Sequence, residues 1–205
     1  MWVYKASWTL CLVLWKIFFR QEFLERENIP ATGHFILAVN HTSFLDPVCA
    51  GLGTSRPDLH FLARSSLFAV PILGAWMKKV NVIPVNREQA DRKSLSQVIK
   101  TLQNGHGILM FPEGTRSKNG QIGAGKPGIG FIAYHSKAPV VPAYIEGSVR
   151  ALSRHSRVIR PVKIRTKYGK PVQLDDLYSR QDSREVYQAI SNRIMEKIKE
   201  ISGQI

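Results

Sequence analysis

The chain has 205 residues, of which 44% are hydrophobic and 21% charged, so disorder over most of its length is excluded. Its 29 lysines and arginines outnumber 15 acidic residues, and the net charge of +14 points to an anionic partner: a nucleic acid, a phosphate-bearing metabolite or an acidic lipid surface. The two cysteines, Cys11 and Cys49, support neither a disulfide framework nor a cysteine-based zinc site and favour a reducing compartment.

The first segment, "MWVYKASWTLCLVLWKIFFRQ", predicts a helix at a membrane interface. It contains three tryptophans and no acid. Its basic residues and one threonine share one narrow stripe of a helical wheel: Lys5, Thr9, Lys16 and Arg20. The uncharged run at 6–15 is shorter than the roughly 20 residues of a membrane span, and no small-residue cleavage site follows it. We expect residues 1–26 to be a retained interfacial helix; a helix docked on the protein's own core and a transmembrane helix are the alternatives.

The remainder, residues 27–205, is predicted to form one α/β domain, and it starts with a turn in "ENIPATG". Apolar runs predict strands at 35–39, 59–63, 80–85, 107–111 and 139–145. Helical patterns between them predict helices at 47–53, 66–79, 91–104 and 127–137. This alternation indicates a mixed, largely parallel sheet flanked by helices.

Two further elements are expected near the C-terminus. "RPVKIRTKY" at 160–168 alternates as a half-buried strand should. The segment 183–201 predicts a packing helix whose apolar stripe consists of Val186, Ile190, Ile194, Ile198 and Ile201. Between 150 and 170 the chain has eight basic residues and no acid, which predicts a patch facing the membrane or an anionic acyl donor.

The motif "NHTSFLDP" follows the strand predicted at 35–39. An imidazole accepts a proton near neutral pH, and a carboxylate on its far nitrogen fixes the tautomer, so His41 and Asp46 form a candidate base and orienting partner. The spacing is suitable if His41 lies in the turn after the strand and Asp46 begins a helix. Thr42 and Ser43 are competent caps for that turn. The alternatives for the pair are a structural hydrogen bond and half of a metal site, and no serine or cysteine is forced into the role of a nucleophile.

A second polar cluster, "FPEGTRS", follows the strand predicted at 107–111. Arginine can bind a phosphate through two parallel hydrogen bonds, and hydroxyls or backbone amides can supply the remaining donors of such a site. "VIPVNR" places Arg87 directly after another strand, and "GAGKPGIG" adds Lys126. A nucleotide-binding P-loop is not supported, because Pro127 follows that lysine. In α/β sheets of this kind, ligands bind at the carboxyl ends of the strands. The loops that carry these polar clusters are therefore expected to face the same edge of the sheet. An Arg–Glu pair across the loop is the alternative.

Together these segments resemble the 1-acyl-glycerol-3-phosphate (lysophosphatidate) acyltransferase family, the glycerolipid acyltransferases with an HxxxxD motif. Four blocks in the family's order carry the resemblance: "NHTSFLD", "NVIPVNR", "FPEGTRS" and "APVVPAYIEG". "ARSSLFAVPILGAW" is similar to the helix between the first two blocks. The resemblance covers about residues 27–147 and implies the glycerolipid acyltransferase fold.

The resemblance also implies roles for individual residues. His41 would be the general base, and Asp46 would orient it. The acceptor's phosphate would be bound by Arg87, Glu113, Gly114, Thr115, Arg116 and Lys126. Val141 and Pro142 would shape the acyl or acceptor pocket. No metal and no cofactor are implied, and the acyl donor would be acyl-CoA or an acylated acyl carrier protein.

The chain departs from the family's pattern in its second block. This block commonly begins with glycine and has aspartate before its arginine, whereas here these positions are Asn81 and Asn86. The basic residue usual before "LF" is Arg64. Loss of a carboxylate beside Arg87 leaves that guanidinium freer for phosphate. It also keeps other acceptors open: glycerol 3-phosphate, another lysophospholipid or a lipid amino acid.

We therefore predict an acyltransferase that moves a fatty acyl group from an acyl thioester to the free hydroxyl of 1-acyl-glycerol 3-phosphate, forming phosphatidic acid in phospholipid biosynthesis. The expected partners are a lysophospholipid acceptor, an acyl thioester donor and an anionic membrane surface, but no nucleic acid. The expected location is peripheral (monotopic), on the cytoplasmic face of the cell membrane. The alternatives of another class are a basic nucleic-acid-binding protein, which would need an aromatic stacking strand or recognition helix that the sequence lacks, and a lipid-binding protein without catalysis.

Overall fold

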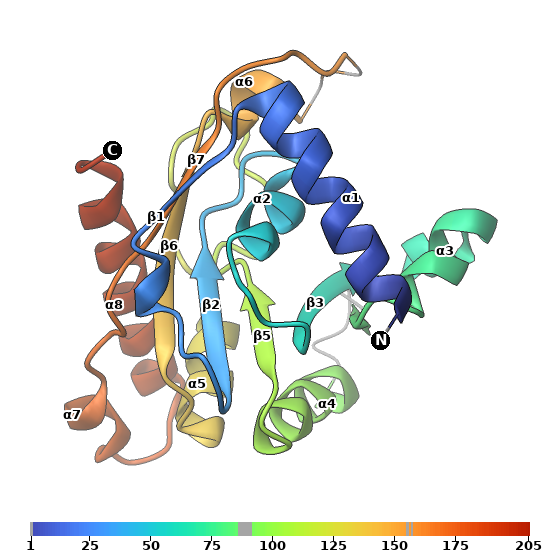
Figure 1. Ribbon diagram of the computed structural model, residues 1–205. Helices are drawn as coiled ribbons and strands as arrows, with labels where there is room; N and C mark the ends of the chain where they lie inside the picture. Colours follow the sequence, from blue (N-terminus) through green and yellow to red (C-terminus); the bar gives the residue numbers. More distant parts are fainter. Residues whose placement is uncertain (1, 86–91, 155, 157) are drawn as a thin grey trace.

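The computed structural model describes residues 2–85, 92–154, 156 and 158–205, so the predictions for Asn86 and Arg87 lie outside the described residues. A seven-stranded sheet with the order β1-β7-β6-β2-β5-β3-β4 forms the centre of the molecule (Figure 1). The strands are β1 (Glu22–Leu24), β2 (Phe35–Val39), β3 (Leu59–Arg64), β4 (Val82–Val85), β5 (Gly107–Met110), β6 (Val140–Glu146) and β7 (Arg165–Tyr168). Neighbouring strands are parallel except β6 and β7. The predicted fold class is confirmed.

Helices cover both faces of this sheet (Figure 1). Helices α4, α5 and α8 pack on one face, and α1 and α2 pack on the other. The helical elements are α1 (Trp2–Phe19), η1 (Arg26–Asn28), α2 (Asp46–Leu52), η2 (Ser65–Ala69), α3 (Pro71–Met77), α4 (Arg92–Gln103), α5 (Pro127–Ser136), α6 (Ser148–Ala151), α7 (Asp175–Tyr178) and α8 (Arg184–Ser202).

Strand β2 shows why the sheet needs both layers. All five of its side chains are fully buried. Ile36 and Ala38 belong to the core beneath α4, α5 and α8, whereas Phe35, Leu37 and Val39 belong to the core beneath α1 and α2. A continuous apolar run is typical of a parallel strand that is buried on both faces. This strand ends directly before the histidine of the first block.

The segment predicted as one helix at 66–79 is two elements, η2 and α3. Val70, between them, has an extended backbone with φ −75° and ψ 118°. The break falls there because the ring of Pro71 disfavours helical geometry in the residue before it. Further along, Asn81 has a φ of 58°. This left-handed conformation explains why the family commonly has glycine at that position, and asparagine is one of the residues that tolerates it.

Strand β1 was not predicted, because three residues are too few to show a period. It extends the sheet beside β7, which covers only 165–168 of the predicted 160–168. The pairing also brings acids to the basic run. Three ion pairs result: Lys163 with Glu22 at 2.6 Å, Arg165 with Glu146 at 2.7 Å and Lys167 with Glu25 at 3.0 Å. Part of the predicted basic patch is thus neutralised by neighbouring strands, and its role towards membrane or donor stays a prediction.

Helix α8 matches its prediction closely. All five residues of the expected apolar stripe are buried. The Ser183 hydroxyl caps the helix by accepting a hydrogen bond from the amide of Val186 at 3.4 Å. The opposite side of the helix is polar, so α8 is a packing helix.

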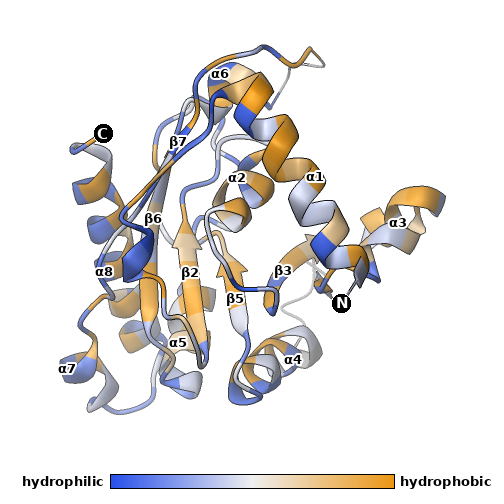
Figure 2. Cartoon of the chain, viewed as in Figure 1, coloured by the Kyte–Doolittle hydropathy of each residue, from blue (hydrophilic) through white to orange (hydrophobic). Residues whose placement is uncertain are grey.

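Helix α1 has three distinct faces. One face is docked on the protein, with Tyr4 and Phe19 buried and the Trp15 indole donating to the Cys49 sulfur at 3.3 Å. A second face is the predicted cationic stripe, whose residues are all exposed. The third face is an exposed apolar stripe that we name the outer stripe, consisting of Trp2, Leu10, Val13, Leu14 and Ile17 (Figure 2). The helix is therefore docked and still presents an amphipathic surface. In the described parts of the chain, no helix is long and apolar enough to cross a membrane.

Candidate active site

The predicted base and its partner lie together at the carboxyl end of β2. His41 is in the turn after this strand, and Asp46 is the first residue of α2. The Nδ1 atom of His41 lies 2.9 Å from Oδ2 of Asp46, and both side chains are buried. With Nδ1 facing a carboxylate, the ring carries its proton on Nδ1, and Nε2 becomes the proton acceptor. The expected turn-and-helix geometry is present.

One oxygen of Asp46 also holds the loop that leads back to it. Besides the imidazole, Oδ2 accepts hydrogen bonds from the amides of Thr42 at 2.6 Å and Ser43 at 2.7 Å. The Ser43 hydroxyl donates to the carbonyl of Leu152 at 2.7 Å and accepts from the amide of Leu45 at 3.1 Å. Ser43 is fully buried. It therefore shapes the turn and is not placed to act as a nucleophile.

The third block packs directly against the first. The Phe111 ring stacks on the His41 ring, with centroids 3.8 Å apart and an interplanar angle of 14°. Glu113 joins two loops, because Oε1 accepts from the His41 amide and Oε2 from the Gly123 amide, each at 2.9 Å. The amide of Ser117 donates to the His41 carbonyl at 2.7 Å. The two polar loops thus face the same sheet edge, as expected.

The two cysteines are not suited to act as nucleophiles either. Burial raises the pKa of the Cys49 thiol well above its usual range, and burial also raises the pKa of Cys11. Both sulfurs therefore stay protonated near neutral pH. Among the residues that the structure describes, no three histidine, cysteine, aspartate or glutamate side chains are grouped so that they could hold a metal ion.

Three of the residues predicted to bind phosphate line one cavity of about 540 Å³, which we name the rim cavity. Gly114, Thr115 and Lys126 lie at its polar part. Gly114 has a φ of 68°, and a Cβ added there would lie 3.1 Å from Cδ of Lys126, so glycine allows the lysine to cross the turn. The deeper wall is apolar and includes Leu95, Val98, Met110, Ile129 and Ile132.

The other predicted phosphate residues are placed differently. The Arg116 guanidinium lies over the Phe44 ring at 3.4 Å from its centroid, and its backbone carbonyl accepts from Arg154 at 3.1 Å. Glu113 is almost fully buried, and its carboxylate is directed at the two amides. That arrangement makes Glu113 a positioning residue, and its direct contact with a phosphate stays a prediction. Arg87 lies outside the described residues.

Arg64 is a residue of the rim cavity that the predicted site omits. It is the last residue of β3 and lines the cavity beside Thr115 and Lys126. A signal was present in the sequence, since a basic residue directly after a predicted strand is the same pattern that selected Arg87.

Val141 and Pro142 lie in the middle of the sheet. Both are buried in β6, where they pair with Leu37 and Ala38 of β2. This register places them opposite the residues two and one positions before the end of β2, and neither lines the rim cavity. Their role in an acyl or acceptor pocket stays a prediction.

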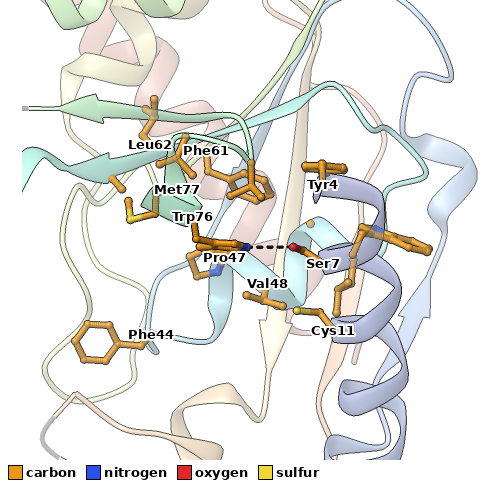
Figure 3. A pocket seen from close by; sticks show the side chains of 16 residues that line it. Tyr4, Ser7, Cys11, Phe44, Pro47, Val48, Phe61, Leu62, Trp76 and Met77 are labelled. Carbon is orange, nitrogen blue, oxygen red and sulfur yellow. Dashed lines mark hydrogen bonds between the residues drawn. The ribbon is translucent and has the colours of Figure 1, made fainter. Parts of the chain in front are cut away.

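A second cavity, of about 250 Å³, lies on the other face of the sheet, and we name it the apolar cavity (Figure 3). Its walls come from α1, α2, α3, β3 and β4, and Phe44, in the loop between His41 and Asp46, belongs to its lining. Trp76 of α3 donates to the Ser7 hydroxyl of α1 at 3.0 Å and so joins two of the cavity's walls (Figure 3). Leu62 and Ala63 of β3 line both cavities. The site therefore has an apolar space on each side of the sheet.

Comparisons with known proteins agree with this geometry. A family model described as "Acyltransferase" matches residues 20–146. A 1-acyl-sn-glycerol-3-phosphate acyltransferase of Bacillus subtilis is 30% identical over 88% of this chain and 87% of its own length. One of Streptococcus pneumoniae is 25% identical over 94% of this chain and 70% of its own. The crystal structure of the 1-acyl-sn-glycerophosphate acyltransferase PlsC from Thermotoga maritima matches with a TM-score of 0.73 and 25% identity, over 95% of this chain and 80% of that one. Fold, paired histidine and aspartate, and relatives together show that the chain belongs to the 1-acyl-sn-glycerol-3-phosphate acyltransferase family of enzymes.

Proposed function

We propose that the enzyme transfers a fatty acyl group from an acyl thioester to the free hydroxyl of 1-acyl-glycerol 3-phosphate and so forms phosphatidic acid in phospholipid biosynthesis. The observation that carries the proposal is the hydrogen bond between His41 and Asp46. This bond engages Nδ1, so Nε2 of the imidazole would accept a proton at the sheet edge where the two polar loops meet. The named relatives act, by their names, on the same acceptor.

The reaction follows from this geometry. Nε2 of His41 removes the proton of the acceptor's hydroxyl while its oxygen attacks the thioester carbonyl. Asp46 stabilises the imidazolium that forms. The tetrahedral oxyanion then collapses, the carbon–sulfur bond breaks, and the imidazolium returns its proton to the leaving thiolate. General base catalysis of this kind contributes on the order of 10²- to 10⁴-fold.

The oxyanion and the acceptor's phosphate need hydrogen-bond donors, and the third block would supply them. Backbone amides or the hydroxyl in the turn 113–116 would stabilise the oxyanion, each contributing about 2.7 to 4 kcal/mol by analogy with measured oxyanion holes. Thr115 and Lys126 of the rim cavity, with Arg64 beside them, would hold the phosphate. Arg116 would add a cation from the side of Phe44. Glu113 would keep the two loops in register.

Helix α1 would attach the enzyme peripherally to the cytoplasmic face of the cell membrane. Its outer stripe would lie among the acyl chains, and Lys5 and Lys16 beside it would meet anionic headgroups. A lipid acceptor would then reach the site from the bilayer. The thioester donor, coenzyme A or acyl carrier protein, is itself anionic and would be attracted by the positive chain.

Thiol release measured with a panel of acceptors and both donor types tests the proposal. The panel contains 1-acyl-glycerol 3-phosphate, glycerol 3-phosphate and a zwitterionic lysophospholipid. We expect the first to give the largest kcat/KM. The His41→Ala variant should lose turnover by about 10²- to 10⁴-fold. The matched control is His135→Ala, since His135 is an exposed histidine on α5. Substantial turnover by His41→Ala would contradict the base assignment.

A further inference from the structure

Helix α3 and the turn before it form an apolar surface that the function proposed above does not use. Ile72 is 87% exposed, which is extreme for an isoleucine. Its exposed neighbours, with which it forms what we name the α3 surface, are Leu67, Val70, Leu73 and Trp76. Figure 1 shows α3 projecting from the edge of the molecule, and Figure 2 shows its apolar character. Soluble monomers rarely expose contiguous apolar patches without an interaction partner.

The α3 surface continues the outer stripe of α1. The two helices are joined by the hydrogen bond from Trp76 to Ser7. On a helical wheel at about 100° per residue, Ser7 lies between the docked face of α1 and the outer stripe, next to Leu14 and on the side opposite the cationic stripe. Helix α3 therefore borders the apolar stripe and not the cationic one. The two apolar surfaces meet at this bond.

The charges around α3 fit an anionic surface. Residues 59–85 contain no acid and three basic residues: Arg64, Lys78 and Lys79. Lys78 and Lys79 are exposed and directly follow α3. Apolar side chains next to lysines are the pattern of segments that lie in a membrane interface, where the lysines reach the headgroups. An apolar interface with a second protein would not require this excess of positive charge.

We infer that the α3 surface is a second membrane-inserting element, which enters the same anionic lipid bilayer as α1. The inference rests on the proposed function, since it assumes a lipid acceptor. It also explains the position of the apolar cavity. Ser7, Trp8 and Cys11 of α1 and Trp76 and Met77 of α3 line this cavity from two sides (Figure 3). With both helices in the bilayer, the cavity faces the acyl region, and an acyl chain enters it without crossing water.

Flotation of the full chain with vesicles of phosphatidylcholine and phosphatidylglycerol tests the inference. The variant is Ile72→Glu, and the matched control is Gln181→Glu, which adds the same charge at an exposed position just before α8. We expect Ile72→Glu to weaken vesicle partitioning by about tenfold or more, because a side chain that enters the bilayer is replaced by a charge. Gln181→Glu should bind as the unaltered protein does. Both variants should unfold at the unaltered temperature, since both side chains are exposed.

Two further measurements separate the possible failures. Turnover in detergent micelles reports on the proposed function alone, and Ile72→Glu should retain it, because Ile72 lines neither cavity. If no form turns over while Ile72→Glu still loses vesicle binding, the proposed function is wrong and the membrane surface stands. Equal flotation of Ile72→Glu and the unaltered protein overturns the inference. So does an oligomer in analytical ultracentrifugation that Ile72→Glu dissociates without a change in flotation.

Discussion

Helices α8 and α1 are similar in length, with 19 and 18 residues, yet they treat their apolar residues in opposite ways. Helix α8 buries its whole apolar stripe against one face of the sheet and exposes polar residues. Helix α1 buries Tyr4 and Phe19 on the other face, but leaves Leu10 and Ile17 of its outer stripe in solvent. Packing on the sheet therefore accounts for every apolar residue of the α8 stripe and for only part of α1.

The same contrast holds for the two faces of the molecule. Among the described residues, the large hydrophobic side chains that are exposed lie on α1, at Phe44, on η2 and α3, and at Val158 and Ile159. None belongs to α4, α5 or α8. Among the described residues, folding thus leaves no large hydrophobic side chain of α4, α5 or α8 exposed, whereas the other face still has apolar surface that a bilayer can cover. His41 and Asp46 lie at the carboxyl end of β2, the strand that contributes to the cores on both faces.

The largest expected effect is on turnover, and it tests whether catalysis and vesicle binding are independent of each other. In Asp46→Asn the side-chain carbonyl oxygen keeps the hydrogen bonds from Nδ1 of His41 and from the amides of Thr42 and Ser43, but the negative charge that stabilises the imidazolium is lost. We expect kcat to fall by about 10²- to 10⁴-fold with vesicle flotation unaltered. Steady-state thiol release and flotation measure the two quantities. A parallel loss of vesicle binding would mean that the site and the membrane surface are not independent.

The next largest effect is expected on stability, on the face of the sheet that α4, α5 and α8 cover. Ile194 of α8 is fully buried, so Ile194→Ala should lower the free energy of unfolding by about 2 to 5 kcal/mol. Urea denaturation followed by circular dichroism gives this value. The variant should float with vesicles as the unaltered protein does when measured well below its midpoint. A loss of less than about 1 kcal/mol would show that α8 is less essential to the core than its burial indicates.

The smallest effect on stability is expected on the face of the sheet that α1 and α2 cover. Ile17 of α1 is 75% exposed, so Ile17→Ser should change the free energy of unfolding by less than about 0.5 kcal/mol. Vesicle partitioning should nevertheless weaken several-fold, because the side chain would leave the acyl region of the bilayer. The same two measurements apply. A large loss of stability with normal flotation would reverse the comparison between α1 and α8.

The sequence was most informative where one helix or strand satisfies its own pattern. The stripe of α8 and the continuous apolar run of β2 follow from burial on one face or two, and both are found as predicted. The spacing of His41 and Asp46 allowed the two side chains to meet if a turn followed the strand and a helix began at Asp46, and both of these local features are present.

Features that depend on distant partners were not predictable in this way. Strand β1 exists because β7 lies beside it, and three residues have no detectable period. The contact of Glu113 with a phosphate stays a prediction, but its hydrogen bond from the amide of His41, 72 residues earlier in the chain, was not predicted. Arg64 reaches the rim cavity only because β3 lies next to β5 in the sheet. In each case the deciding neighbour is set by topology.

The docked face of α1 has a consequence for any shortened form of the enzyme. Ser7, Trp8 and Cys11 form one side of the apolar cavity, and Phe19 fills part of the core beneath α2. Helix α1 is thus part of the folded body of the enzyme. A truncated chain would lose one side of the apolar cavity and a side chain of the core, so the remaining walls of the cavity would open to solvent.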